Sequence, residues 1–485
     1  MFLEYFKSRE QLDLTGGDIS SNLFYLSLPI VVINLLRTAY NITDTFWVGQ
    51  LSADALAAIT FAFPLIFFLI SLGMGIAVAG SVLVAQFEGS GRRKMVNYAA
   101  SQTMVFTFLA SLAIGAFGYF FISPIIGLLG ASESVLPLAT GYMEIISIGL
   151  FAMFGFNVFI SVMRGFGDTL TPMLLMLGAV VLNIILDPFL IFGWWFFPAM
   201  GVEGAAVATI FCRGLALLAG LAIMFSGVKG VKISFSRMVP EPGFLVKMLR
   251  IGVPATVEST GRSISVNALV AIVGIFATPV VAGFGIGIRI FSLVFLPATA
   301  VGRGVETMTG QNLGAGRFDR AEETNWLAAK VMFVLLSLVG VVAFLAAGPI
   351  AFVFTTSAEV AKVGGDFIRI VALSFGFLGA TKAFTGGFRG AGKTAVAAII
   401  SIAALGFIRL PIAFFASKSL GPTGIWAAFP VSNVLGAVIA VAWFSRGTWK
   451  QRVDDGENSG VLDYLLEAGF ELVGSLRSRL PFLDR

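Results

Sequence analysis

The sequence of 485 residues contains no histidine and a single cysteine, Cys212. Without histidine the chain cannot form histidine metal sites, Ser-His-Asp catalysis or a histidine proton relay, so a transferred proton must be carried by Asp or Glu. One cysteine excludes an internal disulfide and a cysteine metal cluster. None of these chemistries is available, and we expect neither enzymatic activity nor a bound cofactor.

Charged residues are also scarce. Asp, Glu, Lys and Arg make up 12% of the chain, against about 25% in soluble domains. Hydrophobic residues make up 57%, and the mean hydropathy is +0.93. This composition predicts an integral membrane protein whose main partner is the lipid bilayer. The formal net charge of +5 comes from basic residues spread over short loops, so we expect no nucleic-acid partner.

Twelve apolar segments are each long enough to cross a bilayer as a helix, at about 1.5 Å of rise per residue. They cover residues 21–48, 54–86, 96–122, 135–163, 170–197, 201–226, 246–276, 280–310, 324–354, 361–387, 394–417 and 421–445. The predicted fold class is therefore an all-α membrane protein with twelve transmembrane helices, which we expect to be a monomer.

The loops between these segments differ in charge. One set is rich in Lys and Arg, including Arg92–Lys94 and residues 229–250, whereas the opposite set holds little beyond Lys362 and Lys418. Basic loops stay on the cytoplasmic side of a membrane. We therefore expect a multi-pass protein of the cell (inner or plasma) membrane with both termini in the cytoplasm.

The two halves of the chain repeat at a constant separation, which we call the repeat offset. It relates Pro29 to Pro254, Arg37 to Arg262, Gln86 to Gln311, Gly89 to Gly314 and Arg164–Thr169 to Arg389–Thr394. Six spans per half insert both copies the same way up, which predicts two six-helix bundles related by a pseudo-two-fold along the membrane normal. The expected domains are an N-terminal bundle (1–226), a cytoplasmic linker (227–247), a C-terminal bundle (248–445) and a cytoplasmic tail (446–485) with an amphipathic helix.

Residues Gly387–Thr394 fit the phosphate-binding pattern G-x(4)-G-K-[ST]. That motif needs a preceding β-strand and a following helix in a soluble sheet, but here a membrane span precedes it. Its repeat counterpart also has Asp168 in place of Lys393. We therefore reject ATP binding and interpret the motif as a tight cytoplasmic turn that Arg389 anchors on the inner side.

Asp44 and Asp187 lie within apolar spans, where a charge costs roughly 2.5–3.5 kcal/mol on insertion scales. Asn183 lies one helical turn before Asp187 on the same face, and Asn41 and Thr209 lie at similar depth. With the orientation given above, both acids fall in the outer half of the bilayer. These residues predict a cation-coupling site for a proton, or for Na⁺ held by Asp44, Asn183 and Asp187.

Other interpretations of the buried charges stay open. The acids could pair with an arginine such as Arg37 and only stabilise the bundle. In the second half, Glu258 and Arg262 lie one turn apart, so they could neutralise each other, and they form a candidate second site. In the second half, the residues at the same depth as the acids are basic. We therefore predict that the N-terminal half is the cation-coupling half.

Several motifs resemble those of the multidrug and toxic compound extrusion (MATE) family. They are Asn41–Gly49 (NITDTFWVG), Arg164–Thr169 (RGFGDT), Asn183-x3-Asp187-Pro188 and Gly201-x2-Gly204, within a similarity that covers roughly residues 15–445. The similarity is closest to a prokaryotic branch with its coupling site in the N-terminal bundle, which implies that role for Asp44, Asn183, Asp187 and Thr209. Phe166 replaces a Glu of some relatives, and Leu378 replaces an Asp of another branch.

The resemblance implies a V-shaped central cavity and efflux by alternating access, driven by an inward H⁺ or Na⁺ gradient. We therefore expect an antiporter that exports small organic molecules, in particular cationic amphipathic compounds. The alternative is a flippase of lipid-linked precursors on a related scaffold, which the basic residues Arg262, Arg289, Arg369 and Arg409 keep open.

Overall fold

A computed structural model describes residues 6–450, and the regular structure within this range is helical throughout. The first half contains α1 (Ile19–Gly49), α2 (Ala53–Gly89), α3 (Arg93–Leu128), α4 (Val135–Ile148), α5 (Leu150–Phe166), α6 (Leu170–Phe192) and α7 (Val202–Ser226). The second half contains α8 (Pro242–Val273), α9 (Thr278–Gly314), α10 (Phe318–Leu345), α11 (Ala347–Phe352), α12 (Ala358–Ala372), α13 (Phe375–Gly390), α14 (Thr394–Ile402), a π-helical segment (Ala403–Arg409), α15 (Leu410–Leu420) and α16 (Pro422–Phe444).

Nine helices among the described residues are long and apolar enough to cross a membrane when α14 to α15 (Thr394–Leu420) is taken as one, and two bent pairs raise the number to eleven. The pairs α4–α5 and α12–α13 each bend by 53° at a short break. Helix α8 has 32 residues, which is long enough for the twelfth span, although its charged residues set it apart in composition. The predicted all-α membrane class is thus confirmed, whereas the predicted amphipathic helix of the tail lies outside the described residues.

Local sequence signals explain where several helices begin and end. Asp18 accepts a hydrogen bond from the N–H of Ser21 at 2.7 Å and begins α1, and Ser52 accepts one from Ala55 at 3.0 Å and begins α2. Gly167, with a φ of 98°, ends α5 in the left-handed conformation that glycine adopts easily. Short polar or glycine turns therefore separate long apolar helices.

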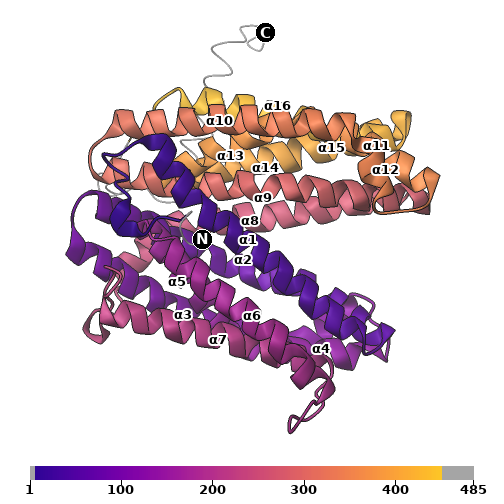
Figure 1. The fold of residues 1–485 in the computed structure, drawn as a ribbon, viewed down its shortest axis with the longest axis horizontal. Helices are drawn as coiled ribbons and strands as arrows, with labels where there is room; N and C mark the ends of the chain where they lie inside the picture. The colour runs from indigo at the N-terminus through magenta and orange to yellow at the C-terminus, as the bar shows by residue number, and fades with distance from the viewer. Residues whose placement is uncertain (1–5, 451–485) are drawn as a thin grey trace, which may run out of the picture.

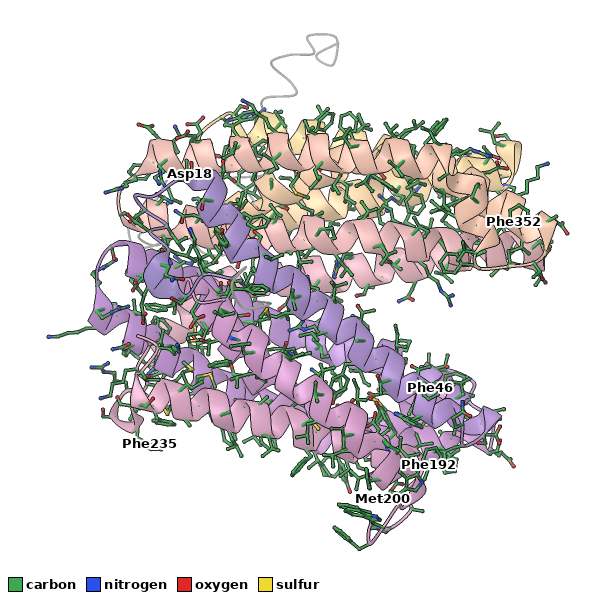
Figure 2. All side chains as sticks on the ribbon, in the orientation of Figure 1. Asp18, Phe46, Phe192, Met200, Phe235 and Phe352 are labelled. Carbon is green, nitrogen blue, oxygen red and sulfur yellow. The ribbon has the colours of Figure 1, made fainter. Side chains whose placement is uncertain are left out.

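The helices form two bundles, α1–α7 and α8–α16 (Figure 1). The bundles meet at one end, which carries Asp18, and diverge toward the other. Figure 2 shows Phe46 and Phe192 at the diverging end of the first bundle and Phe352 at that end of the second. We call the end at which the bundles meet the closed end, and the end at which they diverge the open end. Helix α2 packs on α8 and α9, and α1 packs on α9, so these helices carry the contact between the bundles.

Two glutamines related by the repeat form equivalent hydrogen bonds between the bundles. Gln86 on α2 donates to the carbonyl of Gly390 at 3.0 Å, and Gln311 on α9 donates to the carbonyl of Gly165 at 3.0 Å. The repeat offset relates the two donors to each other and the two acceptors to each other, as the sequence predicts. The two hydrogen bonds confirm that a pseudo-two-fold relates the bundles.

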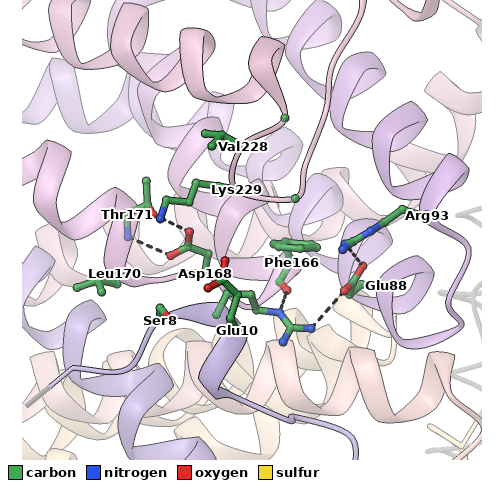
Figure 3. Close-up of a pocket in the computed structure, with 13 residues that line it drawn as sticks. Ser8, Glu10, Glu88, Arg93, Phe166, Asp168, Leu170, Thr171, Val228 and Lys229 are labelled. Atoms are coloured by element: carbon green, nitrogen blue, oxygen red, sulfur yellow. Dashed lines mark hydrogen bonds and ion pairs between the residues drawn. The ribbon is translucent and has the colours of Figure 1, made fainter.

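The segment before α1 crosses the closed end and contacts both bundles. Arg9 donates to the carbonyl of Phe166 at 2.9 Å and pairs with Glu88 at 3.2 Å, and both partners belong to the first bundle (Figure 3). Leu14 packs into the core of the second bundle, where Asn312 donates to its carbonyl at 3.1 Å. The segment therefore ties the bundles together and borders a cavity of about 360 Å³.

The motif that mimics a nucleotide-binding loop is a turn between helices, as predicted. Residues Gly387–Thr394 cover the end of α13 and the start of α14. In the repeat counterpart, Asp168 accepts hydrogen bonds from the N–H and the hydroxyl of Thr171 at 3.0 and 2.6 Å and stabilises the start of α6. Arg389 is buried and pairs with Glu258, and the anchoring of this turn on the inner side of the membrane stays a prediction.

Candidate functional site

Asp44 and Asp187 lie close together near the open end of the first bundle. Asp44 is on α1, five residues before the helix ends at Gly49, and Asp187 is on α6, five residues before that helix ends at Phe192. Helix α1 packs directly on α6. The exposed fractions of the two side chains are 4% and 0%, so both carboxyl groups are enclosed by protein at matching depth.

Neutral polar side chains hold one oxygen of each acid. Asn183 donates to Oδ1 of Asp187 at 2.8 Å, and Thr209 on α7 donates to Oδ2 of Asp44 at 3.3 Å. Asp44 and Asp187 are close enough for the charge of each carboxyl group to act on the other. We call these four residues the carboxylate cluster, and it joins α1, α6 and α7.

Several oxygens of the carboxylate cluster have no protein partner. Oδ1 of Asp44, Oδ1 of Asn183 and Oδ2 of Asp187 are buried, and no described residue donates a hydrogen bond to them. Buried oxygens without a donor are costly, and buried charges more so. Oxygen atoms of carboxylates, amides and hydroxyls are the ligands that hard cations prefer. The cluster therefore fits either a shared proton or Na⁺.

Two residues that the sequence did not single out lie beside the carboxylate cluster. Arg213 lies one turn after Thr209 on α7, near enough for its charge to act on Asp44. Its guanidinium also lies over the ring of Tyr40, 5.1 Å from the ring centre, and Tyr40 is one turn before Asp44 on α1. Spacing of four residues from a predicted site residue is the signal that could have found both.

Asn41 does not join the carboxylate cluster. It is exposed and lines a surface pocket of about 420 Å³ with Thr38, Ile42, Thr45 and Phe46. Three residues along a helix correspond to a rotation about 60° short of a full turn, which places Asn41 on a strip of α1 beside Asp44. Similar depth therefore does not bring it to the same site.

Arg37 does not pair with the acids either. Its guanidinium donates to the amide oxygen of Asn157 at 2.6 Å. Within residues 6–450, the ion pairs of the structure include neither Asp44 nor Asp187. The interpretation in which Arg37 neutralises the acids and only stabilises the bundle thus finds no support in these contacts.

The expected pair of Glu258 with Arg262 is wrong. Glu258 instead forms a buried ion pair with Arg389, in which Nε of Arg389 lies 3.2 Å from Oε2 and Nη2 contacts Oε1, and Ser401 donates to Oε1 at 2.7 Å. Arg262 lies over the ring of Phe295 at 5.4 Å. Helix α8 packs against α14, which brings Ser401 to Glu258, and Arg389 reaches the same carboxylate from α13. This arginine is better placed than the one that α8 itself supplies.

Replacing Glu258 with glutamine is expected to lower the free energy of unfolding by about 3–5 kcal/mol, because it leaves the guanidinium of Arg389 buried without its counter-charge. The measurement is thermal or denaturant unfolding of the protein in detergent. The surface pair Asp366–Arg369 is the matched control, since its side chains are 45% and 47% exposed. Asp366→Asn should cost less than about 1 kcal/mol, and equal effects of the two substitutions would contradict the prediction.

Comparison with known proteins places these features in a family. The sequence model of the MatE family matches residues 29–189 and 254–415, so it matches each half once, and the repeat offset relates the starting points Pro29 and Pro254. The chain is 29% identical over 440 residues to the "Probable multidrug resistance protein YpnP" of Bacillus subtilis, covering 90% of this chain and 97% of the relative. It is also 29% identical over 430 residues to the "FAD transporter" of Shewanella oneidensis, covering 88% and 94%.

A solved structure shares the fold. The crystal structure of a MATE transporter in a bent conformation superposes with a TM-score of 0.85 over 91% of this chain and 98% of that chain, at 24% sequence identity. This likeness concerns the arrangement of helices and not the ligand.

Proposed function

Because the chain belongs to the MatE family of multidrug efflux transporters, we propose that it is a secondary active antiporter. It exports organic compounds while H⁺ or Na⁺ moves inward through the carboxylate cluster. Members of this family are transporters and not enzymes, which agrees with the lack of histidine and of paired cysteines in the sequence. The observation that carries the proposal is the burial of two adjacent carboxyl groups whose oxygens are only partly hydrogen-bonded.

We propose that the closed end faces the cytoplasm, with the protein in the plasma membrane. Arg92 lies between α2 and α3 at the closed end, and Arg93 and Lys94 begin α3; basic loops stay on the cytoplasmic side. In this orientation the carboxylate cluster lies in the outer half of the membrane, and the arrangement of the bundles is outward-facing. Transport then requires the bundles to separate at the closed end and approach each other at the open end.

The carboxylate cluster can couple cation binding to movement of α1. Two neighbouring carboxylates inside the protein repel each other, and a proton or Na⁺ bound between them lowers the cost of their charge. The bound state favours packing of α1 against α6 and α7, whereas release loosens it. Because α1 also packs on α9 of the second bundle, its position affects the contact between the bundles.

The basic residues that favour a lipid-linked precursor flippase do not gather at one place in the described chain. Arg409 is buried and donates to Ser432 and Asn433 at 2.8 Å each. Arg369 pairs with Asp366 on the surface. We therefore favour export of soluble amphipathic compounds. One relative is named an FAD transporter, so we do not restrict the proposed substrates to cationic drugs.

Imposing the two ion gradients separately tests this function. We expect purified protein in proteoliposomes to accumulate a fluorescent compound when either a pH gradient or a Na⁺ gradient is applied alone. A cationic dye such as ethidium and an anionic dye such as carboxyfluorescein should be tested in parallel. The matching ionophore should abolish accumulation, because the gradient supplies the energy. Accumulation that ignores both gradients would contradict the proposed antiport.

A further inference from the structure

A polar cavity lies between the bundles, away from the carboxylate cluster. Its volume is about 120 Å³, and its walls come from α1, α2, α5 and α6 of the first bundle and from α9 of the second. Three arginines line it: Arg37 on α1, Arg164 on α5 and Arg303 on α9. Of the described residues, its lining includes no Asp or Glu. We call it the arginine cavity.

Positive charge around the arginine cavity exceeds the negative charge in contact with it. Arg303 donates to Glu306 at 2.7 Å, and Arg164 lies 3.9 Å from the other oxygen of the same carboxylate. Arg37 donates to Asn157, which is neutral. Within residues 6–450, the carboxylate of Glu306 therefore contacts two of the three guanidinium groups, and that of Arg37 contacts none. A buried charge is costly without a counter-charge.

Hydrogen-bond donors also remain free on the cavity wall. Nε of Arg37, Nε of Arg164 and Oγ1 of Thr299 are buried, and they find no hydrogen-bond partner in the part of the chain that the structure describes. The side chain of Arg164 is enclosed, with an exposed fraction of 8%. All three atoms can donate a hydrogen bond, so the wall offers charge and donors to a ligand that accepts.

The internal repeat shows which group the first half lacks. Arg389, the counterpart of Arg164, is neutralised by Glu258. The repeat offset relates Glu258 to Ile33, and Ile33 lines the arginine cavity. The first half thus keeps the arginine but has an apolar side chain where the second half supplies a carboxylate.

We propose that the arginine cavity binds the anionic group, a phosphate or a carboxylate, of the exported compound. This inference rests on the proposed function as an exporter and names its substrate class. Guanidinium groups bind both anions through paired, charge-assisted hydrogen bonds. Pockets that enclose a whole drug-sized ligand measure about 300–1,000 Å³, so a cavity of about 120 Å³ suits one anionic group. The rest of the ligand extends toward the open end.

Two more basic side chains lie around Phe295, which is outside the lining of the arginine cavity. Phe295 lies two turns before Arg303 on α9, on the side of the open end. The cations of Arg262 and Lys382 lie 5.4 and 4.7 Å from the centre of its ring. A flat organic anion can therefore place its charged group among the three arginines while its apolar part lies beside Phe295.

Equilibrium binding to the purified full-length protein in neutral detergent tests the proposal. The probes share one naphthalene ring and differ in charge: 1-naphthyl phosphate, 1-naphthylacetate and (1-naphthylmethyl)trimethylammonium. We expect both anions to bind, and the cation to bind at least about tenfold more weakly. Arg37→Gln and Arg164→Gln should each weaken anion binding by about tenfold or more, as expected for loss of a hydrogen bond to a charged group. The surface variant Arg369→Gln should leave binding unchanged.

Ile33→Glu separates a binding role from a structural role. The introduced carboxylate can neutralise Arg164 in the way that Glu258 neutralises Arg389. We therefore expect loss of anion binding while the unfolding temperature stays at or above that of the wild type. Ile33→Gln adds the same volume without charge and should bind the naphthyl anions more tightly than Ile33→Glu.

The outcomes are distinguishable. Anion binding that is insensitive to Arg37→Gln, Arg164→Gln and Ile33→Glu, or preferential binding of the cationic probe, would overturn the proposal. Binding of phosphatidylglycerol in nanodiscs that depends on Arg164, without binding of the naphthyl anions, would support the site with a lipid phosphate as its ligand. Because no gradient is used, failure of ion-driven transport would overturn the proposed function and leave this result standing.

Discussion

Asp44→Asn and Asp187→Asn are each expected to reduce gradient-driven export to the level of protein-free liposomes. Asparagine keeps the shape of the side chain but neither exchanges a proton at neutral pH nor carries charge for Na⁺. A ligand shifts a conformational equilibrium only by its difference in affinity for the two states, so a cluster that no longer binds the cation cannot transmit the gradient. The measurement is the initial rate of dye uptake per reconstituted protein.

Two further substitutions calibrate this result. Asp54→Asn removes an exposed acid from the first turn of α2 at the same end of the bundle and should export normally. Thr209→Val removes one hydrogen bond of 3.3 Å to Asp44, and its effect should be intermediate, about two- to tenfold, as expected for a single hydrogen bond. Near-normal, ion-dependent export by both Asp44→Asn and Asp187→Asn would mean that the carboxylate cluster only stabilises the bundle.

Helical geometry is enough to predict much of the carboxylate cluster. Asn183 and Asp187 share a face because they are four residues apart, and the rise per residue places Asp44 at the same depth. Spacing marks Arg213 as a candidate because it lies one turn after Thr209, but only the packing of α7 against the first bundle shows that its charge acts on Asp44. Depth and spacing identify candidates, whereas contacts between helices decide which of them meet.

Glu258 shows why local spacing fails for buried ion pairs. Arg262 is the natural partner from helical periodicity, yet the observed partner, Arg389, is 131 residues away in the chain. Similarly, the predicted span at residues 135–163 is two helices that bend by 53° beside Gly149. Both sides of the break are apolar, so hydropathy alone does not reveal it. The repeat offset, in contrast, relates the two hydrogen bonds of Gln86 and Gln311 to each other, because it reflects the symmetry of the two halves.

That symmetry leads to the second large effect, at the crossing of α2 and α9. A Cβ atom added to Gly89 would collide with the backbone of Gln311, and one added to Gly314 would collide with the backbone of Gln86. Backbone atoms cannot move aside as a flexible side chain can, and overpacking costs about 1–3 kcal/mol. Gly89→Ala and Gly314→Ala should therefore shift the equilibrium away from closure of this end by about 5- to 150-fold and strongly reduce export.

Hydrogen exchange followed by mass spectrometry can detect this shift, because peptides from the ends of α2 and α9 should lose protection in both variants. Gly178→Ala is the matched control, since a Cβ atom there meets no described atom within 4 Å. The repeat allows a stricter test. The Cβ atoms added at Gly89 and Gly314 meet equivalent backbone atoms, so the effects of the two substitutions should be similar in size. Loss of protection in one variant alone would show that the two-fold contact does not govern closure, while unchanged exchange in both would show that the glycines are not required for it.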